Sequence, residues 1–166
     1  IIRGMCTEHE IDFVAEKEEE ILFAECKYRN KGGSKIDLPV ALQNYARFLD
    51  IKKGRNLNGR DFQTIIVTNA KFTSRAINYS ACAGAELLGW KHPAHKGLER
   101  LVENEGLYPV TILPSFKKNL METFVNKKIM LAEDVLRLNT KAFCKRNDLS
   151  PGLIESLKKE AEILLK

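Results

Sequence analysis

The chain has 166 residues, of which 44% are apolar and 30% are charged. This length suits one ordinary domain, or a domain with a short appendage, and the composition is far from that of a disordered chain. No run approaches the ~20 apolar residues of a membrane-spanning helix, so we expect no membrane partner. The net charge of +5 is compatible with a polyanionic partner but does not demand one.

The four cysteines are widely scattered, and no pair has the C-x-x-C spacing of a zinc or redox motif. They suggest no disulfide framework either, and no secretory signal pattern is present, which favours a reducing, cytoplasmic setting. Because the chain begins Ile1-Ile2-Arg3 without a methionine, we expect the natural N-terminus to lie upstream.

Predicted strands alternate with predicted helices over the first part of the chain. Alternating and apolar runs predict strands at about 9–16, 20–28, 62–67 and 86–90. Helical patterns are expected over 38–51, from a cap at Thr73 or Ser74 through Ala85, and over 97–104. In the first of these helices the apolar stripe is expected at Val40, Leu42, Tyr45, Ala46 and Leu49. This order indicates an α/β sheet with helices packed against it.

The composition becomes purely helical after Tyr108-Pro109 and Leu113-Pro114. We therefore divide the chain into an α/β domain, residues 1–112, and a small helical appendage, residues 113–166. The appendage resembles a helix-hairpin-helix unit, with Ser150-Pro151 typical of a cap and first helical residue. It lacks the glycine-containing hairpin through which such units bind DNA, so a packing role is favoured.

Three charged residues on the first two predicted strands form the candidate site. Glu25 and Lys27 share one strand face because side chains at i and i+2 point the same way. If the two strands form a hairpin, Asp12 approaches Glu25 across it. Asp12, Glu25 and the carbonyl of Cys26 could then hold Mg²⁺ through oxygen ligands, with Lys27 assisting an attacking water or stabilising a phosphate.

The triplet Glu25-Cys26-Lys27 carries little information by itself. About four acid-x-base triplets are expected by chance in a chain with 22 acidic and 27 basic residues, and Asp50-Ile51-Lys52 is one of them. The alternative is a surface salt-bridge cluster on an edge strand. The context of a preceding Asp12 and a following helix favours the active-site interpretation.

Asp12, then Glu25-Cys26-Lys27, then a helix carrying Gln43, resembles the D…E-x-K…Q arrangement of restriction-endonuclease-like nucleases, closest to the Mrr-like, type IV restriction family. Wider segments share the resemblance, which covers roughly residues 1–110: 9–15, 25–28, 45–48 and 67–73. The resemblance implies a restriction-endonuclease-like core, a mixed sheet flanked by helices. It also implies hydrolysis of DNA phosphodiesters with Mg²⁺, or Mn²⁺ as a substitute.

The resemblance assigns catalytic roles to Asp12, Glu25 and Lys27, and places Gln43 near the scissile phosphate or the active-site lysine. Such nucleases commonly begin with a helix that bears another acidic residue, and the chain as given lacks it. Glu8 or Glu10 could substitute for that residue. Relatives often carry an N-terminal nucleotide-binding domain, and double-strand cutting needs two active sites, so a homodimer is a further expectation.

Several other residues have both a functional and a structural interpretation. Arg47 could meet a phosphate, but a solvated arginine is favoured, and Trp90 is expected to pack and not to stack on bases. Lys71 and Thr73 follow a strand, where phosphate contacts tend to lie. His9, His92 and His95 are too dispersed for a metal site. A basic loop could also contact the phosphates of the DNA backbone; it contains Lys52, Lys53, Arg55 and Arg60.

The leading hypothesis is therefore a Mg²⁺-dependent DNA endonuclease of the restriction-like class, acting in restriction or DNA processing. The alternatives are a non-catalytic DNA-binding module that keeps the fold, and a regulatory domain of a longer protein. Metal-dependent cleavage distinguishes the first from the second, and DNA binding at low salt distinguishes the second from the third.

Overall fold

The structure is a computed structural model that describes residues 1–54 and 60–166. Its contacts divide the chain into two compact units, Ile1–Arg100 and Leu101–Lys166, here called unit 1 and unit 2. The division falls inside helix α3 (Leu98–Asn104), before the boundary expected at residue 112. None of the described helices is long and apolar enough to cross a membrane.

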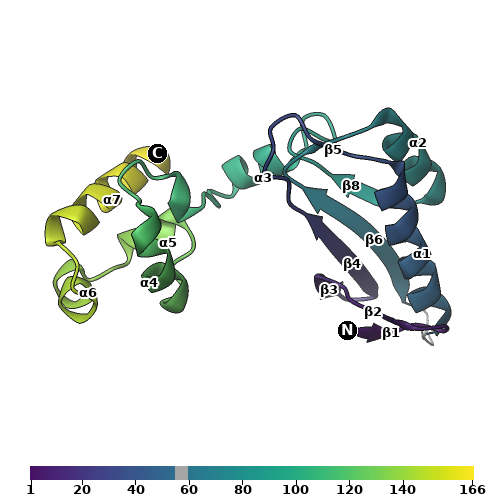
Figure 1. The fold of residues 1–166 in the computed structure, drawn as a ribbon, viewed down its shortest axis with the longest axis horizontal. Helices are drawn as coiled ribbons and strands as arrows, with labels where there is room; N and C mark the ends of the chain where they lie inside the picture. The colour runs from purple at the N-terminus through teal and green to yellow at the C-terminus, as the bar shows by residue number, and fades with distance from the viewer. Residues whose placement is uncertain (55–59) are drawn as a thin grey trace. The chain divides into compact units, whose positions relative to one another are not determined.

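Unit 1 is built on a four-stranded sheet in the order β3-β4-β6-β8 (Figure 1). Its strands are β3 (Phe13–Lys17), β4 (Glu20–Lys27), β6 (Asp61–Thr68) and β8 (Glu86–Leu88). The first two form an antiparallel hairpin, whereas β4, β6 and β8 run parallel. The predicted mixed α/β fold with C-terminal helices is confirmed at this level.

Two small pairings lie outside the central sheet, and the sequence did not predict them as separate pairs. Strands β1 (Ile2–Arg3) and β2 (Glu8–His9) form a short antiparallel hairpin. Strands β5 (Lys35–Ile36) and β7 (Lys71–Phe72) pair in parallel, beyond the ends of β4 and β6. Each strand has two residues, too few to show a period of two in the sequence.

Helices α1 (Leu38–Gly54) and α2 (Ser74–Ala83) pack on the same side of the sheet (Figure 1). The predicted apolar stripe of α1 is right only in part, since Val40 and Tyr45 pack against the core whereas Leu42 and Leu49 are exposed. The helix instead buries a neighbouring face: Ala41, Asn44, Phe48 and Ile51. Phe48 and Ile51 pack against Ile21, Phe23 and Phe62 of the strands, which fixes the rotation of the helix.

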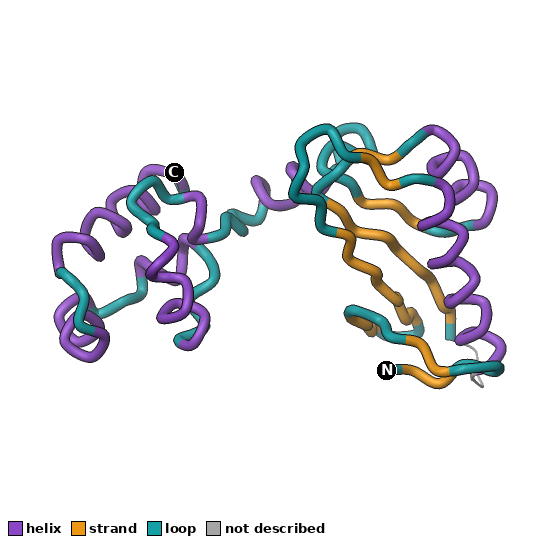
Figure 2. The backbone as a smooth tube through the Cα atoms, in the orientation of Figure 1, coloured by secondary structure: helices purple, strands orange, loops and turns teal. Residues whose placement is uncertain are grey.

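The N-terminal hairpin is fastened to the end of α1 (Figure 2). The Asp50 carboxylate accepts hydrogen bonds from the backbone amides of Cys6 and Thr7, at 2.9 and 3.3 Å, and lies 2.8 Å from His9 Nε2. Gly54 lies so close to the hairpin that a Cβ there would be 2.3 Å from the Met5 amide nitrogen. The close approach therefore requires glycine at this position.

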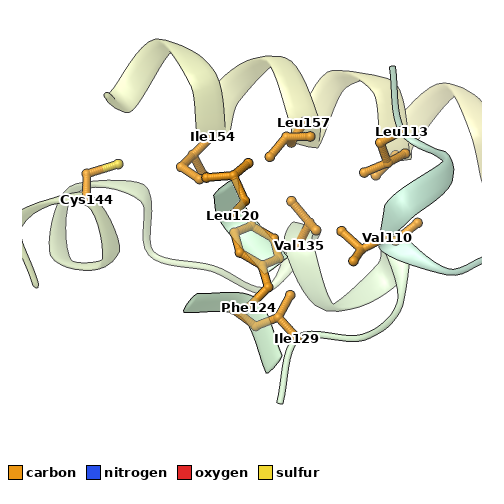
Figure 3. Packing of buried hydrophobic residues seen from close by; sticks show 11 residues of the cluster. Val110, Leu113, Leu120, Phe124, Ile129, Val135, Cys144, Ile154 and Leu157 are labelled. Carbon is orange, nitrogen blue, oxygen red and sulfur yellow. The ribbon is translucent and has the colours of Figure 1, made fainter. Parts of the chain in front are cut away.

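Unit 2 consists of short helices around one apolar core (Figure 3). Its elements are η1 (Val110–Ile112), η2 (Lys118–Leu120), α4 (Met121–Asn126), α5 (Ala132–Leu136), α6 (Thr140–Asn147) and α7 (Pro151–Leu164). Phe124 lies at the centre, with the rings of Phe116 and Phe143 packed edge-on at 5.2 and 5.8 Å. Ser150 and Pro151 begin α7 as the sequence predicted, although the Ser150 hydroxyl makes no capping hydrogen bond.

The basic loop expected after α1 needs correction. Lys52 and Lys53 belong to the last turn of the helix. Arg60 precedes β6 and pairs with Glu16 at 3.2 Å, and Arg55 lies outside the described residues. Because β6 runs parallel to β4 from Asp61 opposite Glu20, Arg60 lies at the far end of the sheet from the candidate site, roughly 20 Å away.

Candidate active site

The register of the β3–β4 hairpin brings Asp12 to the end of β4. Phe13, the first residue of β3, lies opposite Ala24, so Asp12 falls opposite Glu25, one step beyond the last paired residues. The Asp12 carboxylate accepts a hydrogen bond of 2.6 Å from the Cys26 amide. Asp12 is therefore an exposed residue just before the strand, and not within it as the sequence indicated.

Glu25 and Lys27 lie on the same side of β4, as the strand period predicts. The Glu25 side chain is only 7% exposed, and the Lys27 ammonium donates a hydrogen bond to its Oε1. A second cation comes from α1, where Arg47 Nη1 lies 3.2 Å from both Oε1 and Oε2. A buried carboxylate is costly without partners, and here two cations surround it.

Arg47 is the residue of this site that the sequence did not identify, since a solvated arginine was favoured. The buried face of α1 explains its position, because Arg47 lies three residues after Asn44 and four before Ile51. Gln43 is exposed one helical turn before Arg47, on the same side of the helix, and its side chain makes no hydrogen bond with the described residues.

The surroundings of Cys26 help define what the site can hold. Burial raises the pKa of the Cys26 thiol, and the carboxylates of Asp12 and Glu25 raise it further, whereas Lys27 lowers it. The thiol therefore stays protonated at neutral pH and is a poor metal ligand. Within residues 1–54 and 60–166 no group of three or more His, Cys, Asp or Glu side chains could hold a metal ion, and neither Glu8 nor Glu10 completes one.

The backbone after the site is held by β6. Thr68 donates its hydroxyl to the Lys27 carbonyl, and its oxygen accepts from the Ala70 amide at 3.1 Å. Asn69 accepts from the Arg29 amide at 2.8 Å and donates to the Arg29 carbonyl at 2.9 Å. These bonds fix the course of the chain for two residues beyond Lys27, which the sequence could not show.

The other residues that the sequence suggested as functional lie outside the candidate site and make different contacts. Thr73 caps α2, with its hydroxyl accepting from the Ala76 amide, while Lys71 is exposed on β7. His9 pairs with Asp50, and the His92 ring packs edge-on against Phe72. Trp90, expected to be a packing residue, packs only in part, since it is 40% exposed after the end of β8.

Three comparisons place the chain among known proteins. A family model described as AF1548-like, C-terminal, matches residues 108–165. An uncharacterized protein of Archaeoglobus fulgidus is 39% identical over 142 residues, which are 82% of this chain and 74% of that protein. The crystal structure of AF1548, a protein of unknown function, superimposes with a TM-score of 0.76 and 35% identity over 99% of this chain and 85% of that one. The likeness thus extends over both units.

Proposed function

The chain belongs to the AF1548-like family, and we propose that its first unit is a metal-dependent endonuclease that hydrolyses DNA phosphodiester bonds. The observation that carries the proposal is the meeting of Asp12, Glu25 and Lys27 at the end of one β-hairpin. A mixed sheet with α1 following the Glu25–Lys27 strand supports the further proposal of a restriction-endonuclease-like core, as in Mrr-like proteins.

The donor set suits a hard divalent cation. Asp12 and Glu25 offer carboxylate oxygens and Cys26 a backbone carbonyl, which are the ligands that Mg²⁺ and Mn²⁺ prefer. Asp12 is exposed, whereas both oxygens of Glu25 face cationic groups, so binding requires Arg47 to release one of them. A divalent cation bound there would lower the pKa of a water and stabilise negative charge on a phosphate.

The side chains of the site have separate tasks in this proposal. Lys27 is only partly exposed, with its ammonium held beside Glu25, and would donate to a phosphate oxygen as charge develops there. Arg47 would hold the buried Glu25 side chain in its orientation before DNA arrives. Gln43, exposed one turn from Arg47, would contact the neighbouring backbone phosphate. Cleavage of both DNA strands would require two copies of the chain.

Plasmid cleavage tests the proposal. The purified chain should nick supercoiled DNA with Mg²⁺ or Mn²⁺ and not with EDTA. The Lys27→Ala variant should cut at least about 100-fold more slowly, the usual loss for one charge-stabilising group. Lys17→Ala is the matched control, because Lys17 is an exposed lysine at the other end of the same hairpin.

Two results would refute the mechanism: undiminished cutting by Lys27→Ala, or no cutting by the wild-type chain with any divalent metal. The second result would favour a non-catalytic DNA-binding module. One observation already favours that alternative, since Lys27 and Arg47 occupy both oxygens of Glu25. Salt-sensitive DNA binding without metal-dependent cutting would identify it.

A further inference from the structure

A cavity of about 240 Å³ lies beyond the carboxyl ends of the parallel strands of unit 1. Its lining includes Arg29 after β4, Asn69 and Ala70 after β6, and Trp90 after β8. The glycine-containing loop 31–34 and Lys71 complete it on the side of β5 and β7. Ligands of α/β sheets bind at such strand ends. The volume is below the roughly 300–1,000 Å³ of pockets for drug-sized ligands, so it suits a small group.

The charge of this pocket is entirely positive. Arg29, Lys31, Lys71 and Lys91 line it, and no acidic residue among those the structure describes does so. Lys91 alone among them has an ion pair with a described residue, an exposed one with Glu99 at 3.9 Å. Cations concentrated in a concave surface attract an anion more strongly than the same charges spread over a flat one. The pocket is therefore suited to an anionic ligand.

Trp90 gives the pocket an aromatic surface, and its backbone is held in place by hydrogen bonds. Its amide donates to the Ala70 carbonyl at 3.3 Å, and its carbonyl accepts from the Glu99 amide at 3.0 Å. A Cβ at Gly97 would lie 2.6 Å from the Trp90 carbonyl oxygen, so the following loop packs tightly behind it. The backbone is thus held on both sides, while 40% of the residue is exposed. An exposed aromatic side chain on a fixed backbone, beside cations, is suited to stacking a nucleic-acid base.

The opposite wall leaves room for such a ligand. A Cβ at either Gly32 or Gly33 would have no atom within 4 Å, so open space surrounds both of these lining residues. Gly33 has a φ of +78°, a conformation that side chains larger than glycine rarely adopt. The loop closes through the Ser34 amide, which donates to the Lys31 carbonyl at 3.2 Å.

The pocket is also continuous with the candidate active site along the backbone. Arg29 lies two residues beyond Lys27, a rise of about 7 Å in extended chain, which one nucleotide can span. Asn69 fixes the Arg29 backbone with two hydrogen bonds. A DNA strand with a phosphate at Lys27 can therefore extend its next nucleotide toward Trp90.

We propose that this pocket binds one unstacked nucleotide of a DNA strand, with its base against Trp90 and its phosphate held by Arg29 and Lys71. The proposal rests on the proposed function for the choice of DNA, but nucleotide binding itself needs neither metal nor cleavage. The ligand chemistry is that of a nucleoside monophosphate, free or within a single strand. The pocket would then bias the endonuclease toward DNA that is unpaired or locally opened.

Trp90 makes a direct test simple, because it is the only tryptophan of the chain. The full chain is titrated at low salt in EDTA with a single-stranded oligodeoxynucleotide, the matching duplex, dAMP, and deoxyribose 5-phosphate. The single strand should quench Trp90 fluorescence and bind at least tenfold more tightly than the duplex. Deoxyribose 5-phosphate, which lacks only the base, should bind at least tenfold more weakly than dAMP.

Variants of the pocket residues test whether the single strand binds in this pocket. Their affinity is measured by the fluorescence anisotropy of a labelled single strand. Trp90→Leu and Lys71→Ala should each weaken binding at least threefold, and Trp90→Phe should restore much of what Trp90→Leu loses. Lys17→Ala is the control and should bind as the wild type does. Lys71 is exposed on a short strand, so its variant remains informative even where Trp90→Leu fails to fold.

The outcomes separate this proposal from the nuclease proposal. Trp90 quenching by the single strand in Lys27→Ala, or in a chain that cuts no DNA, supports the pocket and leaves cleavage to be judged by the plasmid assay. Equal binding of deoxyribose 5-phosphate and dAMP would overturn the pocket as a base site. Equal binding of duplex and single strand, or unchanged binding by both Trp90→Leu and Lys71→Ala, would overturn it as well.

Discussion

The two units of the chain differ in what they bury. The buried polar or charged side chains of the described residues all belong to unit 1: Glu25, Asn44, Thr64, Thr68 and Ser80. The buried core of unit 2 is apolar, from Val110 to Ala161. Buried polar groups reduce stability unless they are hydrogen-bonded, and among these five described side chains only the Ser80 hydroxyl has no partner.

The polar groups of unit 1 are concentrated on β4 and its neighbours. Asn44 of α1 donates to the Thr64 hydroxyl at 3.0 Å, and that hydroxyl donates to the Phe23 carbonyl at 3.2 Å. Thr68 binds the Lys27 carbonyl in the same way near the end of the strand. The comparison indicates that the buried polar groups of unit 1 position the end of β4, whereas the interior of unit 2 is an apolar core.

The variant with the largest expected effect tests unit 2, whose buried core is apolar. Phe124→Ala should destabilise unit 2 by about 3–5 kcal/mol, because it removes the central ring of the core and leaves a cavity. Trp90 lies in unit 1 and reports on that unit only, whereas far-UV circular dichroism follows both. Thermal unfolding should therefore show an earlier dichroism transition and an unchanged fluorescence transition.

The control for this variant is Ile163→Ala, since Ile163 is 66% exposed on α7. It should change the free energy of unfolding by no more than about 0.5 kcal/mol. If Phe124→Ala lowered the Trp90 transition as much as the dichroism transition, the two cores would unfold as one, and the comparison between units would lose its basis.

The sequence predicted the elements whose signals are local. Helix α1 and strand β6 appear nearly where the patterns placed them, and the strand period correctly put Glu25 and Lys27 on one face. The rotation of α1 was predicted inaccurately, because the expected stripe combined Val40 and Tyr45, which pack against the core, with Leu42 and Leu49, which are exposed. The helix buries positions 41, 44, 48 and 51 instead, and this spacing follows the helical period.

That error accounts for most of what was missed in the site. On the stripe expected from the sequence, Arg47 faces solvent, whereas on the observed stripe it borders the sheet beside Glu25. The spacing of Phe48 and Ile51 along the helix could have indicated that Arg47 borders the sheet. The exposure of Trp90 had no comparable signal, because it depends on which residues fail to cover the end of β8.

The variant with an intermediate expected effect tests unit 1, which buries polar and charged side chains. Arg47→Met should destabilise unit 1 by about 1–3 kcal/mol, because the buried Glu25 keeps only Lys27 as a partner. Urea unfolding followed by Trp90 fluorescence measures it. Glu25→Gln combined with Arg47→Met should recover part of the loss, since the uncompensated charge is then absent.

The control is Arg60→Met, which removes the exposed ion pair with Glu16. Surface pairs of this kind contribute little, so the change should stay below about 1 kcal/mol. Equal losses for Arg47→Met and Arg60→Met, or strictly additive effects in the double variant, would mean that Glu25 does not depend on Arg47. The buried charge would then not distinguish unit 1 from unit 2 energetically.

The smallest expected effect concerns the hairpin fastened to α1 and depends on pH. The hydrogen bond with His9 holds the pKa of Asp50 well below its ordinary value of 3.8, and bonds from Cys6 and Thr7 add to this effect. A pKa lowered by folding stabilises the fold above the ordinary value, and this contribution is lost as the pH falls below about 4. Urea unfolding from pH 6 to pH 3 should therefore show Asp50→Asn less stable than the wild type at pH 6, with the gap closing as the pH falls. The control is Glu8→Gln, which changes an exposed residue of the same hairpin. Its difference in stability from the wild type should not change between pH 6 and pH 3. A gap for Asp50→Asn that stayed constant down to pH 3 would show that the fastening depends on shape and not on the charge of Asp50.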